Sequence, residues 1–515
     1  MAMPSAAGAP PLDKEASEAN RVNIVGRLER LPMTNYQRKI FAVIASAWLV
    51  DQIDVALLTF LLGSLIVEFG ISPEQVGLLA AMTFAGQLVG NLVAGTSSDM
   101  FGRKFVFQAT MIVWGIASLL AAISWSVSAL MFFRFLIGIG VGGEAPVAQA
   151  MVSEFVPANV RGKYIAIMEG FWAVGFVLSG TISYFLLPVL GWRYVFVAVG
   201  LLSGVVFLVR RNIPESPRWL AEKGRIAEAD AIMTTMEREV ERRTGQPLPP
   251  AQLISAPPHH ENPWATLFSP QYRGRTLMAG LMWFFALLGF FGLNSWIAVL
   301  LKDHGYSIVK SVGFVTLITT GGIPGFALAA WLLEAIGRKP TTVLFLVMSA
   351  VTAYIYGNAS DVVVFSLGNG LDATRLFCAG WIMQFFMFGM WSCLYAYTPE
   401  LYPTRARSTG AGLDATRLFC AGWGMQFFMF GMWSCLYAYT PELYPTRARS
   451  TGAGLASAVG RIGAIISPIV IGYIIKDVGQ YGVFALGAGS FLIAAVVVLL
   501  LGVETRGEVL EQVSS

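Results

Sequence analysis

Long apolar runs recur along the whole of this 515-residue chain, and they constrain its fold more than any other feature. Each run is long enough for a helix to cross a hydrocarbon core of roughly 30 Å, which takes about 17 to 25 residues. Because lipid offers no partner to an unpaired backbone N–H or C=O group, such segments cross a membrane as helices. A 56% share of hydrophobic residues and only 13% charged residues agree with this interpretation. The pattern predicts an all-α membrane protein with spans near residues 41–67, 75–96, 105–124, 127–153, 164–187, 194–210, 277–300, 311–333, 341–357, 455–475 and 483–502, and one more span from the repeat described below.

A polar, charge-rich stretch divides these runs into two groups. It includes a helical pattern at residues 226–243. Lys and Arg concentrate on alternate connections between the runs, so the positive-inside rule places those connections, the polar stretch and both chain termini in the cytoplasm. The expected parts are a disordered arm at 1–35 that ends in an amphipathic stretch at 23–31, a six-helix bundle at 36–210, a linker at 211–275, a second six-helix bundle at 276–503 and a tail at 504–515.

A tandem repeat interrupts the second group of runs. Residues 370–411 and 412–453 are copies of each other that differ only at Ile382 and Gly424. Counting one copy gives twelve spans, whereas counting both gives thirteen and would place Arg506 on the outside, against the charge rule. We therefore expect one copy to fill the position of a tenth helix in a 12-helix fold, and the other copy to lie re-entrant or peripheral.

An ionisable side chain at the bilayer centre costs about 2.5–3.5 kcal/mol on insertion scales, so each one needs a partner or a function. Asp51 and Asp54 are three residues apart and share a helical face. At 1.5 Å of rise per residue, Asp54 and Arg134 reach similar depths in the first and fourth spans. They form either a static ion pair or a site that takes up and releases a proton, and Arg134 also suits a substrate carboxylate. The candidates for proton coupling or substrate binding are Asp51, Asp54, Arg134, Glu144, Glu169 and Arg461.

Aromatic side chains are dense in the repeated span. A flat ring would stack well on them, although such side chains in membrane helices also serve packing or interface anchoring. The candidates for a substrate cavity are Asn294 and Trp296 in the seventh span, with Gln384, Trp391 and Tyr395 of the first copy or Gln426, Trp433 and Tyr437 of the second.

Short sequence motifs, called words here, combine glycine, acidic and basic residues and fall on the predicted cytoplasmic connections. The first is "GTSSDMFGRK", in which glycine permits a tight turn and an acid can cap a helix or pair with a base. The words "SEFVPANVRG", "PESPRWL", "EAIGRK", "PELYPTRARSTG" and "VETRG" follow. They predict a cytoplasmic gate that includes Asp99, Gly102, Arg103, Glu154, Arg161, Glu215, Arg218, Glu334 and Arg338.

Taken in order, these words resemble the major facilitator superfamily, and its sugar-porter-like branch in particular. The resemblance covers roughly residues 35–508 and implies two six-helix bundles with a solute site between them. Two features depart from sugar porters: the seventh span lacks their Gln-rich word, and Ala330 replaces an expected glycine. The word "DQID" in the first span and "MEGFW" in the fifth are similar to bacterial niacin permeases and aromatic-acid symporters.

The sequence thus predicts a secondary transporter and not an enzyme. No glycine loop with a following lysine suggests ATP use, no basic stripe suggests nucleic acid, and the cysteines and histidines suggest no metal or other cofactor. We expect proton-coupled import of a small organic acid, such as nicotinate or a related aromatic carboxylate, across the cytoplasmic membrane by a monomer. An exporter of drugs or metabolites with the same fold, or a sensor that binds solute without moving it, remains an alternative.

Overall fold

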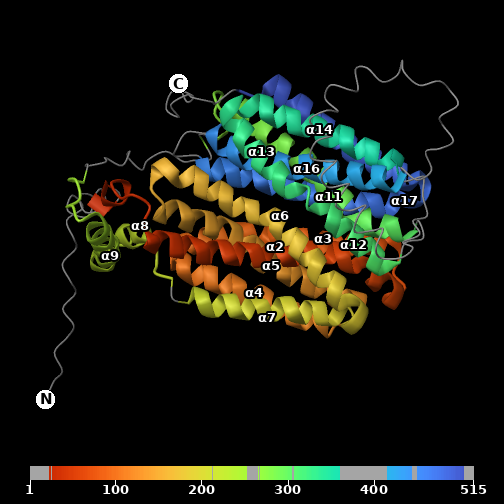
Figure 1. Cartoon of the computed structure of the whole chain (residues 1–515), viewed down its shortest axis with the longest axis horizontal. Helices are drawn as coiled ribbons and strands as arrows, with labels where there is room; N and C mark the ends of the chain where they lie inside the picture. The colour runs from red at the N-terminus through yellow and green to blue at the C-terminus, as the bar shows by residue number, and fades with distance from the viewer. Residues whose placement is uncertain are drawn as a thin grey trace.

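The structure is a computed structural model of two helical bundles that lie side by side (Figure 1). The elements that it describes are helices. The described residues are 23–24, 26–211, 213–251, 265, 267–303, 307–359, 414–443 and 449–503.

The first bundle, called the N bundle, contains the six helices from α2 to α7. Glycine and capping residues separate them: α2 ends before Gly70, whose φ of 61° terminates the helix, and Ser72 caps α3 in front of Pro73. The bounds are α2 Asn35–Phe69, α3 Pro73–Phe101, α4 Arg103–Ala122, α5 Val127–Phe155, α6 Ala158–Leu190 and α7 Trp192–Arg210.

The second bundle, called the C bundle, contains the described helices α11, α12, α13, α14, α16 and α17. Its second span is made of α12 and α13, and α17 breaks at Gly479 into two spans, Gly454–Gly479 and Tyr481–Leu501. Ten segments of the described chain are long and apolar enough to cross a membrane, and α14 and α16, packed in the same bundle, complete twelve. The bounds are α11 Arg273–Asp303, α12 Ile308–Thr319, α13 Gly322–Ala335, α14 Arg338–Ala359, α16 Asp414–Glu442 and α17 Arg449–Leu501.

Helix α16 contains the span of the second repeat copy. It packs against α13 and α14 as a member of the C bundle. The first copy lies outside the described residues, so its expected displaced position stays a prediction.

The linker helices α8 (Pro217–Glu222) and α9 (Ile226–Thr244), together with the end of the arm, form a small cap at one end of the bundles (Figure 1). We call this the linker end, and the opposite one the far end. Helix α9 confirms the helical pattern predicted at 226–243.

The last part of the arm differs from the expected disorder over residues 1–35. Residues 26–29 are helical, and Arg27 forms ion pairs with Asp230 at 2.5 Å and with Glu237 at 2.8 Å on α9. Leu28 is fully buried, because the amphipathic stretch has α9 as a partner. Burial raises the pKa of Glu237, but hydrogen bonds from Arg27 and Arg30 outweigh it and hold that pKa below its usual range.

The two bundles contact each other closely at the far end, where α3 meets α17. A Cβ atom on Gly77 would collide with the carbonyl oxygen of Pro468, and one on Gly472 would lie 2.5 Å from that of Pro73. Nearby, Lys476 forms an ion pair with Glu74 at 3.2 Å. Because Gly77 and Gly472 have no side chain, the two helices can approach closely enough for the bundles to close this end.

A side chain at Gly77 should therefore force the far end apart. Overpacking costs typically about 1–3 kcal/mol, so Gly77→Val should reduce the population closed at the far end by about tenfold. Electron spin resonance distances between labels at Val67 and Tyr481, in a chain whose native cysteines have been replaced, should lengthen in this variant. Gly204→Val is the matched control, because a Cβ there meets no atom within 4 Å. An unchanged distance distribution in Gly77→Val would contradict the role of this contact.

Candidate functional site

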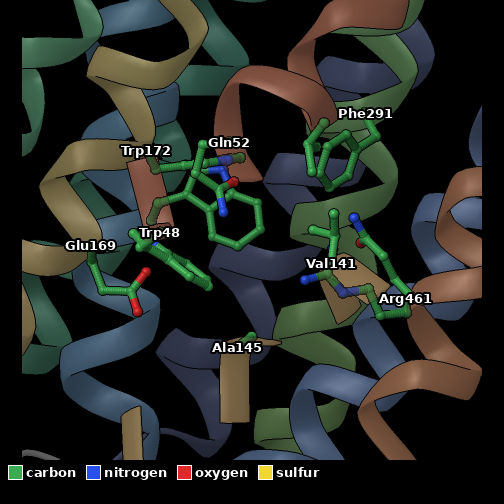
Figure 2. A pocket seen from close by; sticks show the side chains of 11 residues that line it. Trp48, Gln52, Val141, Ala145, Glu169, Trp172, Phe291 and Arg461 are labelled. Atoms are coloured by element: carbon green, nitrogen blue, oxygen red, sulfur yellow. The ribbon is translucent and has the colours of Figure 1, made fainter. Parts of the chain in front are cut away.

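A narrow cavity lies between the two bundles, with about 400 Å³ of space free of atoms when the adjoining open solvent is included. Figure 2 shows Glu169 and Arg461 facing it from opposite sides, with Trp172 and Phe291 above. Both bundles contribute, so a solute held here would touch both. The lining side chains are Trp48, Gln52 and Val55 of α2, Gln87 of α3, Val141 and Ala145 of α5, Glu169 and Trp172 of α6, Phe291 of α11, Trp433 of α16 and Arg461 of α17.

The cavity contains one acid from the N bundle and one base from the C bundle. Glu169 is only 2% exposed, and its Oε1 accepts a hydrogen bond from the side-chain amide of Gln149 at 3.0 Å. The charge of Arg461 acts on Glu169 across the cavity. A guanidinium in such a place presents a fork of N–H donors that matches a carboxylate.

Aromatic rings form a layer over this charged pair. Trp172 of α6 lies 4.2 Å from Trp433 of α16 and 4.9 Å from Phe290 of α11, centroid to centroid, in tilted or edge-on contact. Phe84 of α3 contacts Phe291 at 4.3 Å. Since the rings come from both bundles, a flat ligand ring could pack against either side of the layer.

Two buried polar atoms on the wall of the cavity have no hydrogen-bond partner among the described residues. They are the indole N–H of Trp48 and the amide oxygen of Gln87. A buried polar group without a partner costs about 1–3 kcal/mol, which makes both atoms candidates for contact with water or solute.

Asp54 and Arg134 are brought together as the sequence predicts, inside the N bundle. Arg134 Nη1 lies 3.2 Å from Asp54 Oδ2, and both side chains are fully buried. Arg134 Nε donates to Thr83 Oγ1 at 3.0 Å, and Ser118 Oγ donates to Asp54 Oδ1 at 3.4 Å. The pair does not line the cavity between the bundles, where Arg461 supplies the cation.

Asp51 and Glu144 lie beside each other next to this pair. Glu144 forms an ion pair with Arg210 Nη1 and accepts a hydrogen bond from the indole N–H of Trp114 at 3.1 Å. The guanidinium of Arg210 sits 3.2 Å from the centroid of the Phe107 ring. These residues lie on four helices of the N bundle, so the charges also hold the helices in register.

Asn294 and Gln426 join α11 to α16 within the C bundle. Gln426 Nε2 donates to Asn294 Oδ1 at 2.9 Å, and Asn294 Nδ2 donates to the carbonyl oxygen of Phe290 at 3.0 Å. Trp296 is buried in the same bundle, and of the proposed cavity residues on α16 it is Trp433 that lines the cavity. The amide pair therefore supports the cavity wall from behind.

Residues from several of the motifs predicted to form the gate contact each other at the linker end. Arg103 forms an ion pair with Glu154 at 3.2 Å, and Glu215 accepts backbone hydrogen bonds from Arg103 and Lys104 at the start of α4. Glu215 thereby supplies the negative charge that a helix N-terminus favours. On the same side, Arg218 forms an ion pair with Glu29 at 2.7 Å.

Gly102 is required at the start of α4 for two reasons. Its φ is 102°, and an added Cβ would lie 2.5 Å from Glu215 Oε2. Strained backbone of this kind costs about 1–3 kcal/mol, so Gly102→Ala should lower the apparent Tm of the purified protein. Gly224→Ala is the control, because its φ is 74° and no atom lies near the added Cβ. Equal Tm shifts in both variants would show that the Glu215 contact does not matter.

In the C bundle, Arg338 donates to the carbonyl oxygen of Leu333 at 2.6 Å, next to Gly337 with a φ of 106°. This turn matches the one at Gly102 in position and backbone. Several predicted residues cannot be placed: Gln384, Trp391 and Tyr395 lie outside the described residues, as do the side chains of Asp99, Arg161, Glu334 and Tyr437.

Several residues of these sites are absent from the sequence-based candidates. Trp48 and Gln52 lie one turn apart on α2, and an amide inside an apolar run was the available signal. Arg210 ends its apolar run next to Arg211 and is grouped with the loop charges for that reason. Gln87 had no distinguishing pattern in the sequence, and Trp172, the last residue of "MEGFW", was marked only by the family resemblance.

Comparison with known proteins agrees with the predicted resemblance. Residues 44–425 match the family model described as Major Facilitator Superfamily, and residues 417–515 match the one described as Sugar (and other) transporter. The chain is 31% identical to the niacin transporter NiaP of Acinetobacter baylyi, over 96% of this chain and 100% of the relative. It is 27% identical to the 4-hydroxybenzoate transporter PcaK of the same organism, over 76% of this chain and 84% of the relative.

The fold also matches solved structures. The xylose transporter XylE from E. coli, in an inward-open conformation, superposes with a TM-score of 0.64 at 18% identity, over 93% of this chain and 99% of that one. The predicted family and the all-helical fold are thus confirmed, and the protein is a multi-pass membrane transporter and not an enzyme. The chain belongs to the major facilitator superfamily.

Proposed function

We propose that this transporter imports a small aromatic carboxylate, with nicotinate as the favoured solute, by proton symport. The observation that carries the proposal is the composition of the cavity: Arg461, a cation from the C bundle, lies below a layer of Trp and Phe rings. An aromatic acid needs both features, because its carboxylate requires a donor fork and its ring requires apolar faces.

The relatives support this solute class. NiaP and PcaK are described as transporters of niacin and 4-hydroxybenzoate, two flat rings that each carry one carboxylate. A sugar has no charge for Arg461 to pair with.

The Asp54–Arg134 pair is the proposed proton-coupling site. Both side chains are fully buried, and each has further polar partners on neighbouring helices. A proton on Asp54 would cancel its charge and weaken its hold on Arg134, which lets the helices of the N bundle shift. Solute binding across the cavity would favour the same shift, since the solute touches both bundles.

We propose that the linker end faces the cytoplasm, with both chain termini on that side. The turns at that end contain Arg103, Lys104 and the basic residues that follow α7, as the positive-inside rule requires. The far end, closed by the α3–α17 contact, is then the outer end, and Gly77 belongs to an outer gate. We also propose that the protein works as a monomer, since each chain contains both bundles that line its cavity.

Uptake of labelled nicotinate by cells that express the protein tests the proposal. Accumulation above that of empty cells should occur and should disappear when a protonophore collapses the proton gradient. Accumulation that persists with the protonophore would overturn the symport mechanism. Absence of uptake, with labelled 4-hydroxybenzoate and benzoate also excluded, would overturn the solute class.

A further inference from the structure

The N bundle contains a group of buried charges that the proposed coupling pair does not use. It consists of Asp51 on α2, Glu144 on α5 and Arg210 on α7, and all three side chains are at most 1% exposed. We call it the Asp51 cluster. Since a buried ionised group without a partner is expensive, the hydrogen bonds and charges of this cluster should balance.

The charges of Glu144 and Arg210 neutralise each other. Arg210 Nη1 forms an ion pair with one oxygen of Glu144, and the indole N–H of Trp114 donates to the other oxygen at 3.1 Å. Arg210 further contacts the Phe107 ring and the sulfur of Met111, the latter at 3.0 Å. The single positive charge of this cluster is therefore matched by one carboxylate.

Asp51 is left without a donor. Neither of its carboxyl oxygens accepts a hydrogen bond from any described residue. The polar group beside it is Glu144, and the charged groups that act on it are Glu144, Arg210 and Asp54. An ionised carboxylate only accepts hydrogen bonds, so Asp51 and Glu144 cannot bond to each other unless one of them carries a proton.

The charge count leads to the same conclusion. The Asp51 cluster and the neighbouring Asp54–Arg134 pair together contain three acids and two arginines, which leaves one negative charge in excess. Asp54 and Arg134 neutralise each other at 3.2 Å. The excess therefore falls on Asp51 and Glu144, and one proton shared between them removes it.

We propose that Asp51 and Glu144 together bind one proton, so that the N bundle has a second proton site beside the Asp54–Arg134 pair. Arg210 and Trp114 bind the two oxygens of Glu144 and so favour its ionised form, which leaves Asp51 to hold the proton. The site is a property of the folded protein and does not depend on which solute is imported. Its proton could join the transport cycle if the α2, α5 and α7 helices separate as the bundles move.

Infrared difference spectroscopy of the purified protein, without solute, tests this site. The absorption of protonated carboxyl groups should be present at neutral pH in the unaltered protein. Asp51→Asn and Glu144→Gln should each remove the equivalent of one protonated carboxyl per chain, because either change leaves one acid for one arginine. Arg210→Met should act in the opposite direction and add one, since two carboxylates then lack a cation. Glu228→Gln is the control, because Glu228 is an exposed acid on α9 paired with Arg225.

Circular dichroism spectra must show that Asp51→Asn and Glu144→Gln are folded, and both replacements keep the shape of the side chain. An unchanged carboxyl absorption in both variants would overturn the proposal. It would also fail if the signal of the unaltered protein responded to sodium concentration at constant pH, because the cluster would then hold a sodium ion. Neither outcome bears on nicotinate uptake, so this test and that of the proposed function can fail independently.

Discussion

Arg461→Gln should reduce nicotinate uptake by at least tenfold when the solute is present well below saturation. Loss of one member of a buried charge pair costs about 2–5 kcal/mol, and each 1.4 kcal/mol corresponds to a factor of ten. The variant removes the cation that would meet the solute carboxylate and also the charge that faces Glu169. Arg461→Lys should recover only part of the uptake, because an ammonium retains the charge but not the paired donors of the guanidinium.

Initial rates of labelled uptake at several concentrations measure this effect. Nicotinamide has no carboxylate, so any uptake of nicotinamide should fall less than that of nicotinate. Arg225→Gln is the matched control: Arg225 lies on the surface of the linker, and its ion pair with Glu228 is exposed. If Arg461→Gln imports nicotinate like the unaltered protein, the carboxylate binds elsewhere and the proposed solute site is wrong.

The arrangement of charges explains why the cavity needs both bundles. Glu169 belongs to α6 of the N bundle and Arg461 to α17 of the C bundle. In the proposed binding mode, a solute anion that binds Arg461 would also place its ring against Trp172 of the N bundle and Trp433 of the C bundle, which contact each other. Binding energy is then available only while the bundles are close enough to share the solute, which couples occupancy to their relative position.

The fold could be predicted because each span is recognisable in the sequence by its length and apolar composition. The run expected at 127–153 is α5 at Val127–Phe155, and the run expected at 194–210 is α7 at Trp192–Arg210. Helix ends extend beyond the apolar runs, as in α2, where Thr34 and Gln37 form a capping box upstream of the predicted start. The end of the arm was not predicted to be ordered, because its order depends on ion pairs with residues of α9 that are distant in the sequence.

Contacts within the site could be predicted only where two residues meet because they lie at the same depth in their spans. Asp54 and Arg134 meet because both lie near the middle of their spans. The rotation of each helix decides which face lines the cavity, and apolar runs with aromatic residues on all sides do not reveal it. The positions of Trp48, Gln87 and Trp172 in the cavity wall therefore emerged only from the packing of the two bundles.

Asp54→Asn should abolish protonophore-sensitive accumulation of nicotinate and also destabilise the protein. Asparagine cannot carry the proton, and it leaves Arg134 charged and fully buried without a counter-charge. Breaking a buried pair in this way costs about 3–5 kcal/mol, so the apparent Tm of the purified variant should fall clearly. Loss of accumulation alone would not separate these two effects, since an unstable transporter also fails to accumulate solute.

The double variant Asp54→Asn with Arg134→Gln separates coupling from stability. It removes both charges and leaves a neutral pair of amides with Thr83 and Ser118 as partners, so most of the lost Tm should return. Accumulation should nevertheless remain absent, because no titratable group is left at this position. If the double variant still accumulates nicotinate and the protonophore still abolishes that accumulation, the coupling proton does not reside on Asp54. The carrier would then be another buried acid, Asp51, Glu144 or Glu169, and the Asp54–Arg134 pair would act only as a tie between α2 and α5.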